Sequence, residues 1–177
     1  MADTRFQLCD VSLDGPLQSA RAHIERERSL AVYDLLEDNS FIPVGHHGGP
    51  YRLTLTLANA KLAFHIATEN GTPSVSHDLS LSPFRRILKD YILICDSHSD
   101  AFHCAGAARF EAIDLSRRAI HDEASELLKA CLAPKVAIDL DTARRLFTQF
   151  TCCSCVTPPI TLGLNGCRWL QPRQRRE

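Results

Sequence analysis

Apolar residues at every second position mark the middle of the chain as β-structure. The pattern runs through residues 51–57 and resumes over residues 61–66, with Ala58-Asn59-Ala60 between the two segments. A period of two is that of a half-buried strand, and a short connection containing Asn joins such strands into an antiparallel hairpin. A turn at Asn70-Gly71-Thr72-Pro73 follows, and residues 75–81 then continue at strand spacing. The sequence therefore predicts three consecutive strands in one antiparallel arrangement.

A helical period appears on both sides of this strand region. Apolar residues recur three and four positions apart in four segments, which we expect to be helices: residues 19–38, 83–106, 110–132 and 142–150. Ser82 and Pro83 predict an N-cap and a first helical residue, and Asp141 is expected to cap the last helix. Apolar segments at residues 5–13 and 136–140 predict two further strands.

The order of these elements predicts an α+β fold. Strand, helix, three strands, two helices, strand and helix follow one another over residues 1–150. Consecutive strands with tight turns favour a mostly antiparallel sheet, here of about four or five strands, and about four amphipathic helices can cover one of its faces. We therefore expect a single, two-layered domain over residues 1–150.

Composition and charge restrict the class of partner. The 177-residue chain is 45% hydrophobic and 23% charged, which is typical of a soluble globular protein. The last 27 residues hold four of the 20 Lys and Arg residues and one of the 21 Asp and Glu residues, so residues 1–150 have a net charge of −4. Nucleic-acid-binding domains usually carry a basic surplus, so nucleic acid is not expected as a partner. No segment has the apolar length of a signal peptide or a membrane span, so we expect no membrane contact and a cytoplasmic location.

Several segments of the first 150 residues resemble, in the same order, a known bacterial family. They are DLLEDNSF (34–41), GGPYRL (48–53), LSPFRRILKDY (81–91), EAID (111–114) and IDLDTARRLF (138–147). These segments are similar to the uncharacterised protein family UPF 0262, and the resemblance covers about residues 5–150. It implies a small cytosolic bacterial protein, and it supplies no activity and no catalytic residues.

The resemblance stops near Phe150, where the composition changes to Cys, Pro and Arg. We expect residues 151–177 to be a divergent, poorly ordered tail, which a shifted reading frame, a mis-called stop or a genuine extension would each produce. Four of the eight cysteines lie here, including the Cys-x-x-Cys pair Cys152 and Cys155. A zinc site typically needs two such pairs, and a redox pair usually begins a helix after a strand. Cys152 and Cys155 meet neither condition and are only weak candidates for a metal or redox centre.

Two arginine doublets near predicted helix starts are the strongest candidates for a binding site. Arg85 and Arg86 follow one predicted cap by three and four residues, and Arg144 and Arg145 follow another at the same offset. Positive charge at a helix start opposes the helix dipole, so we expect an acidic partner near each doublet. That partner is either an acidic residue of the same fold or an external phosphate or carboxylate.

Two histidines fall on the apolar faces of predicted elements. His77 lies on the third strand of the antiparallel set, and His98 lies on the helix that follows it. A hydrogen-bonded core histidine is one interpretation, and general acid–base catalysis is the other. No Ser-His-Asp order, phosphate-binding glycine loop or His-Glu-x-x-His motif is present in the sequence, so a catalytic function is not favoured.

Three functional hypotheses remain open at this point. We prefer a non-catalytic module that binds a partner protein or an anionic ligand through the arginine doublets, and we expect no cofactor. The first alternative is a small enzyme for a phosphorylated or carboxylated metabolite, with Arg85 and Arg144 holding the anion and His77 or His98 as the acid–base group. The second alternative is a metal or redox protein that uses the C-terminal cysteines.

Overall fold

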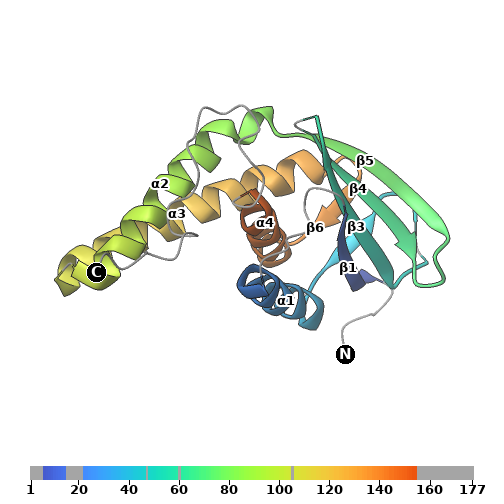
Figure 1. Cartoon of the computed structure of the whole chain (residues 1–177). Helices are drawn as coiled ribbons and strands as arrows, with labels where there is room; N and C mark the ends of the chain where they lie inside the picture. Colours follow the sequence, from blue (N-terminus) through green and yellow to red (C-terminus); the bar gives the residue numbers. More distant parts are fainter. Residues whose placement is uncertain (1–5, 15–21, 47, 60, 105, 155–177) are drawn as a thin grey trace.

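The computed structural model describes residues 6–14, 22–46, 48–59, 61–104 and 106–154 of the chain (Figure 1). These residues form four α-helices, one short 3-10 helix and two β-sheets, so the α+β prediction is confirmed. In chain order the elements are β1 (Leu8–Asp14), α1 (Ala22–Glu37), β2 (Phe41–Pro43), β3 (Tyr51–Ala58), β4 (Lys61–Thr68), β5 (Pro73–Ser80), the 3-10 helix η3 (Ser82–Phe84), α2 (Arg85–Cys104), α3 (Ala107–Leu132), β6 (Val136–Ile138) and α4 (Leu140–Ser154).

The larger sheet has the strand order β1-β3-β4-β5. The predicted hairpin is present, because β3 and β4 pair antiparallel with Leu55 opposite Phe64, and β5 pairs antiparallel with β4. Asn59 at the hairpin turn has a positive φ of 51°, a conformation that Asn tolerates better than most residues. β1 runs parallel to β3, and the chain passes through α1 and β2 between them, as a parallel pair requires a long crossover. β2 and β6 form a second, two-stranded antiparallel sheet.

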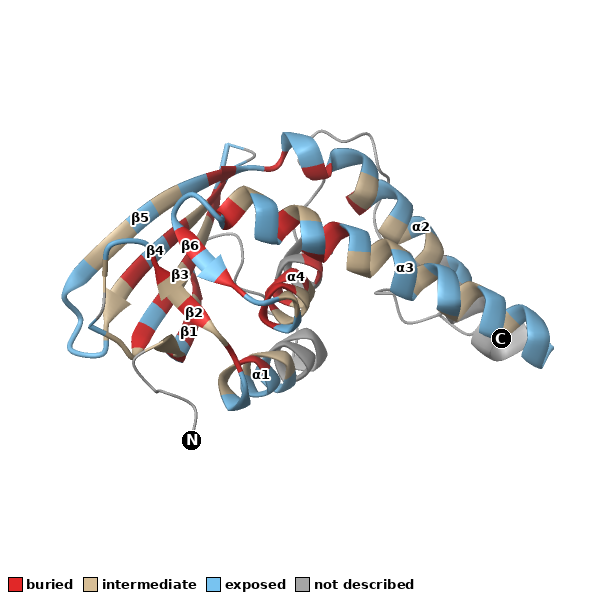
Figure 2. Ribbon diagram, turned by 180° about the vertical axis from the view of Figure 1, so that it is seen from behind, coloured by how far each residue is buried: buried red, intermediate tan, exposed pale blue. Residues whose placement is uncertain are grey.

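One face of the larger sheet is buried. The apolar side chains at alternate positions of β3 and β4 are buried, and the residues between them are exposed or half-buried. In Figure 1 the four helices lie on the same side of this sheet. Figure 2 shows the buried residues gathered where β3 and β4 approach α4 and the end of α3. The hydrophobic core therefore lies between the larger sheet and the helices. No element that the structure describes covers the opposite face of the sheet.

Two of the predicted helix caps are wrong. Leu81, not Ser82, precedes the first helical residue, and no side chain caps this end, because Ser82 and Pro83 already belong to η3. At α4 the cap is Asp139, whose Oδ1 accepts a hydrogen bond from the Thr142 backbone N–H at 2.7 Å. A side-chain carboxylate that accepts from the backbone N–H three residues later is the usual geometry of an N-cap. With Asp139 as the cap, α4 starts at Leu140, two residues before the start predicted with Asp141 as the cap. It also continues past Phe150 to Ser154.

Helices α2 and α3 pack against each other and together extend away from the sheet (Figures 1 and 2). The fully buried residues of α3 all lie in its C-terminal third, between Ala124 and Leu132. Residues 107–120 of α3 have no fully buried side chain and form, with the paired part of α2, a projecting arm. None of the described helices combines the length and the apolar composition needed to cross a membrane.

Candidate functional site

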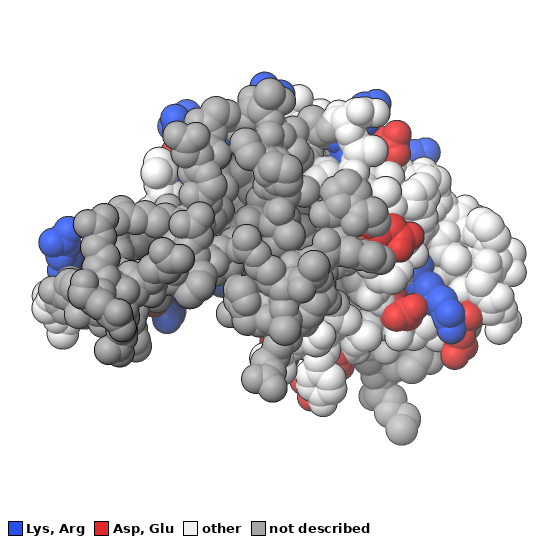
Figure 3. All heavy atoms as spheres, viewed as in Figure 1, with Lys and Arg blue, Asp and Glu red and all other residues white. Residues whose placement is uncertain are grey.

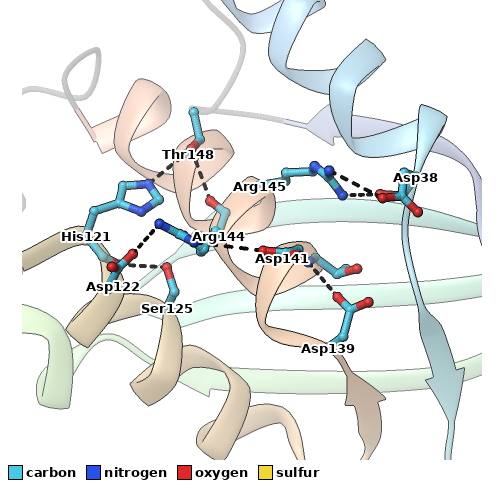
Figure 4. Close-up of polar contacts among 10 residues, drawn as sticks. Asp38, His121, Asp122, Ser125, Asp139, Asp141, Arg144, Arg145 and Thr148 are labelled. Atoms are coloured by element: carbon cyan, nitrogen blue, oxygen red, sulfur yellow. Dashed lines mark hydrogen bonds and ion pairs between the residues drawn. The ribbon is translucent and has the colours of Figure 1, made fainter. Parts of the chain in front are cut away.

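Helix α4 carries one of the predicted arginine doublets between α1 and α3 (Figure 4). Arg144 Nη2 lies 2.7 Å from Asp122 Oδ1 on α3, and Arg144 Nη1 lies 3.8 Å from Asp141 Oδ1. Arg145 points toward the end of α1, where Nη1 donates to the backbone carbonyl of Asp38 and Nη2 lies 3.5 Å from its Oδ2. Both arginines of this doublet therefore have acidic partners inside the fold.

His121 on α3 lies next to this doublet. Its Nε2 lies 3.2 Å from Thr148 Oγ1, and the Thr148 hydroxyl donates to the Arg144 carbonyl at 3.1 Å. Because the Thr148 hydrogen is used in that second bond, the oxygen is left to accept, and Nε2 is the nitrogen of His121 that carries the proton. The imidazole packs against the rings of Tyr91 and Phe147, at centroid distances of 5.7 and 5.1 Å, and these two rings also contact each other at 5.6 Å.

The environment of His121 favours its neutral form. Burial lowers the pKa of the imidazole below its usual value of 6.5, and the positive charges of Arg144 and Arg117 lower it further, while Asp122 acts in the opposite direction. No motif in the sequence singles out this histidine. The available signal was its helical spacing, because His121 precedes the buried Ala124 and Leu128 by three and seven residues.

The other doublet lies where α2 begins and has a different environment. Arg85 and Arg86 are both exposed, and the Arg86 side chain is 92% exposed. Arg86 Nε lies 3.9 Å from Asp90 Oδ2, one turn along the same helix. Among the described residues, no ion pair joins Arg85 or Arg86 to another element of the fold. The two doublets also share no acidic partner within the described part of the chain.

The predicted histidine and cysteine candidates are placed only in part. His77 lies on β5 opposite Phe64, is half-buried, and its Nε2 is buried without a hydrogen-bond partner in the described structure. His98 and Cys152 belong to α2 and α4, but their side chains lie outside the described residues, and so does the whole of Cys155. No group of three His, Cys, Asp or Glu side chains suited to a metal ion occurs among the residues that the structure describes. The acid–base and metal roles of these residues stay predictions.

Comparison with known proteins identifies the family. A family model described as "Uncharacterised protein family (UPF0262)" matches residues 5–155. The chain belongs to this family. A UPF0262 protein of Rhizobium etli is 53% identical over 148 residues, which cover 84% of this chain and 94% of that protein. UPF0262 proteins of Agrobacterium fabrum and Mesorhizobium japonicum are each 49% identical and cover 84% and 82% of this chain, and 94% and 91% of their own lengths. No solved structure is significantly similar to the chain.

Proposed function

We propose that this UPF0262 protein is a non-catalytic, cytoplasmic binding module that recognises an anionic group through the start of α2. The observation that supports the proposal is the difference between the two arginine doublets. Arg144 and Arg145 have acidic partners from α3 and from the end of α1, whereas Arg85 and Arg86 are exposed, and among the described residues their ion pairing is limited to Arg86 with Asp90 on the same helix. An exposed guanidinium pair can form bidentate hydrogen bonds with a phosphate or carboxylate.

The start of α2 holds this doublet on a rigid support. Phe84, immediately before it, is fully buried in the core, and Leu88 on the next turn is also buried. The Arg85 backbone N–H already donates to the Ser82 carbonyl, so the guanidinium groups rather than this N–H would contact the anion. Lys89 is exposed one turn further on, and Figure 3 shows Lys and Arg side chains along the edge of the molecule where α2 begins. A bound anion would offset the unfavourable interaction of these charges with the helix dipole.

Titration of the full chain tests the proposal. Calorimetry and thermal shift would be measured with inorganic phosphate, pyrophosphate, citrate and a hexaglutamate peptide at low and high salt. We expect binding of at least one of these anions that weakens with salt and is lost in the Arg85→Gln/Arg86→Gln variant. The matched control is Arg109→Gln/Lys129→Gln, which removes two positive charges from exposed residues elsewhere. If no anion binds, or if both double variants bind equally well, the proposal is wrong.

The enzyme hypothesis has less support. It requires Arg144 to hold a substrate anion, and this side chain already lies 2.7 Å from the Asp122 carboxylate. An incoming anion would have to displace Asp122, which would then be left half-buried beside the new negative charge. Arg85 and Arg86 carry no such cost, which is why the binding hypothesis is preferred.

A further inference from the structure

Leu115 on α3 is 70% exposed, more than the other exposed large hydrophobic residues of the described structure. It lies on the projecting arm, and Ala108, Ala112 and Ala119 on the same helix are also exposed. These four residues are spaced by four, three and four positions, so they project from one side of the helix. We call them the α3 arm face. This face lies on an element that extends away from the core, where another protein surface can cover it.

The spacing and the flanking charges of the arm face indicate what covers it. Apolar residues at alternating offsets of four and three are the pattern by which one helix packs along another. Glu111 and Arg118 each precede an alanine of the face by one residue, so both lie along the same edge of it, and both are exposed. Arg118 Nη2 lies 2.8 Å from Asp114 Oδ2 on the same helix, but the Arg118 side chain is 67% exposed. Its other N–H groups can therefore donate to a second carboxylate.

We propose that the α3 arm face packs antiparallel against the same face of a second copy of this chain, forming a two-fold symmetric dimer. With the axis between residues 113 and 114, Leu115 of each copy lies opposite Ala112 of the other, and Ala108 lies opposite Ala119. A large side chain therefore meets a small one at each of the two central positions. The alanines allow the helices to approach to about 8 Å, near the lower limit for helix packing.

Charge complementarity selects this partner and this register. In an antiparallel helix pair, a residue one position before a packing residue lies on the edge of the contact. It is next to the equivalent edge residues of the partner helix. Here Glu111 of one copy faces Arg118 of the other, and the two-fold axis repeats the contact, so two opposite-charge pairs flank the apolar centre. A surface that is complementary to itself in both shape and charge is what an isologous dimer needs.

The position of the face on the arm permits the contact. In this register Ala107 of one copy lies opposite Ile120 of the other, so the overlap ends before Ala124, where the buried part of α3 begins. The antiparallel direction places the two protein bodies at opposite ends of the shared helix pair. The overlap spans roughly 20 Å of helix. So short a contact is expected to give a weak, concentration-dependent dimer rather than an obligate one.

Sedimentation equilibrium of the full chain under reducing conditions, over a wide concentration range, tests the dimer. We expect reversible dimerisation in which Leu115→Glu raises the dissociation constant roughly a hundredfold or more, because each dimer loses two apolar contacts and gains two buried charges. Leu93→Glu is the matched control, since Leu93 is a 52% exposed leucine on the other helix of the arm. It should leave the dissociation constant unchanged, and circular dichroism would show that both variants are folded.

A charge-reversal experiment tests the partner and the register together. Glu111→Arg alone and Arg118→Glu alone should each weaken the dimer roughly tenfold, because each places like charges together twice. A mixture of these two variants restores both opposite-charge pairs, so it should form a heterodimer as stable as the native dimer. A chain that is monomeric at all concentrations, a dimer unaffected by Leu115→Glu, or a mixture no more associated than its components would each overturn the proposal.

Discussion

The side-chain amide of Asn39 forms hydrogen bonds with both backbone groups of Leu8. Its Oδ1 accepts from the Leu8 N–H at 2.6 Å, and its Nδ2 donates to the Leu8 carbonyl at 3.3 Å and to the Leu35 carbonyl at 3.0 Å. Asn39 is buried, and its amide therefore takes the place of a neighbouring strand at the start of β1. Because Asn39 also donates a hydrogen bond to the Leu35 carbonyl near the end of α1, it connects the first strand to the first helix.

Removal of this amide should destabilise the fold. We expect Asn39→Ala to lower the free energy of unfolding by about 2–3 kcal/mol, because it leaves buried backbone groups of Leu8 without partners. Urea denaturation followed by circular dichroism measures the change. Asn70→Ala, at an exposed turn, should have little effect. Equal losses in the two variants would contradict the role assigned to Asn39.

His121 should make stability depend on pH. Its pKa is lowered in the folded state by burial and by Arg144, so the unfolded chain binds more protons once the pH falls below about 6.5. The free energy of unfolding should therefore be fully maintained above that pH and should decrease as the pH falls toward the lower, folded-state pKa. His121→Gln, which can still donate to Thr148, should flatten this part of the curve.

The control for this pH dependence is His65→Gln, since His65 is exposed on the open face of the sheet and bonds to Ser76. Because this variant also loses one histidine, it separates the effect of His121 from a general effect of replacing a histidine. If His121→Gln retains the full slope, another group is responsible for it.

Two buried polar residues of α4 should respond in opposite directions to apolar replacement. Gln149 is fully buried, and neither of its amide atoms has a partner in the described structure. Gln149→Met should raise the free energy of unfolding by about 1–2 kcal/mol, which corresponds to a few degrees in Tm. Thr142 is equally buried, but its Oγ1 accepts a hydrogen bond from the Ser40 N–H at 2.8 Å. Thr142→Val should therefore lower the free energy of unfolding by about 1–2 kcal/mol.

Differential scanning calorimetry of the two variants and the native chain measures whether Tm rises in Gln149→Met and falls in Thr142→Val. A lower Tm for Gln149→Met would mean that its amide makes an interaction that the present contacts do not include. A neutral result for Thr142→Val would mean that the Ser40 N–H finds another partner.

Truncation should locate the end of the folded domain. The family match ends at residue 155, and Thr151 is buried within α4, where its Oγ1 donates to the Thr148 carbonyl at 3.1 Å. A chain that ends after Cys155 should unfold at the same temperature as the full chain. A chain that ends after Phe150 should lose about 1–2 kcal/mol because it lacks the last turn of α4. Identical melting of all three chains would place the boundary at Phe150.

The sequence predicted those elements whose own periodicity carries the information. The alternation in residues 51–57 and 61–66 identifies the β3–β4 hairpin without reference to the rest of the chain, because the two strands are joined by a short turn. The resemblance to the family was equally local, since it depended on short segments in a fixed order. Helix starts were less predictable, because Asp139 and Asp141 both have the chemistry of a cap and only the backbone path selects between them.

For the candidate site, the sequence supplied the arginines but not their partners. Arg144 pairs with Asp122 and Arg145 with Asp38, residues that are 22 and 107 positions away along the chain. His121 was missed because its spacing resembles that of an ordinary buried helix position, and its lowered pKa depends on packing against α2 and α4. The contrast between the two doublets, on which the proposed function rests, is therefore a property of tertiary structure.

By itself, the sequence determined which face of each strand and helix is apolar, because the period of a pattern depends only on neighbouring residues. Only the tertiary structure decided what covers each face. It placed β1 parallel to β3 and paired β2 with β6, two strands that are far apart in the sequence. It also gave Arg144 and Arg145 acidic partners and left the other arginine doublet exposed. It also left Leu115 uncovered on the arm. The physical reason is that hydrophobic burial is not directional, so a periodic apolar face specifies that it must be covered but not by which part of the fold.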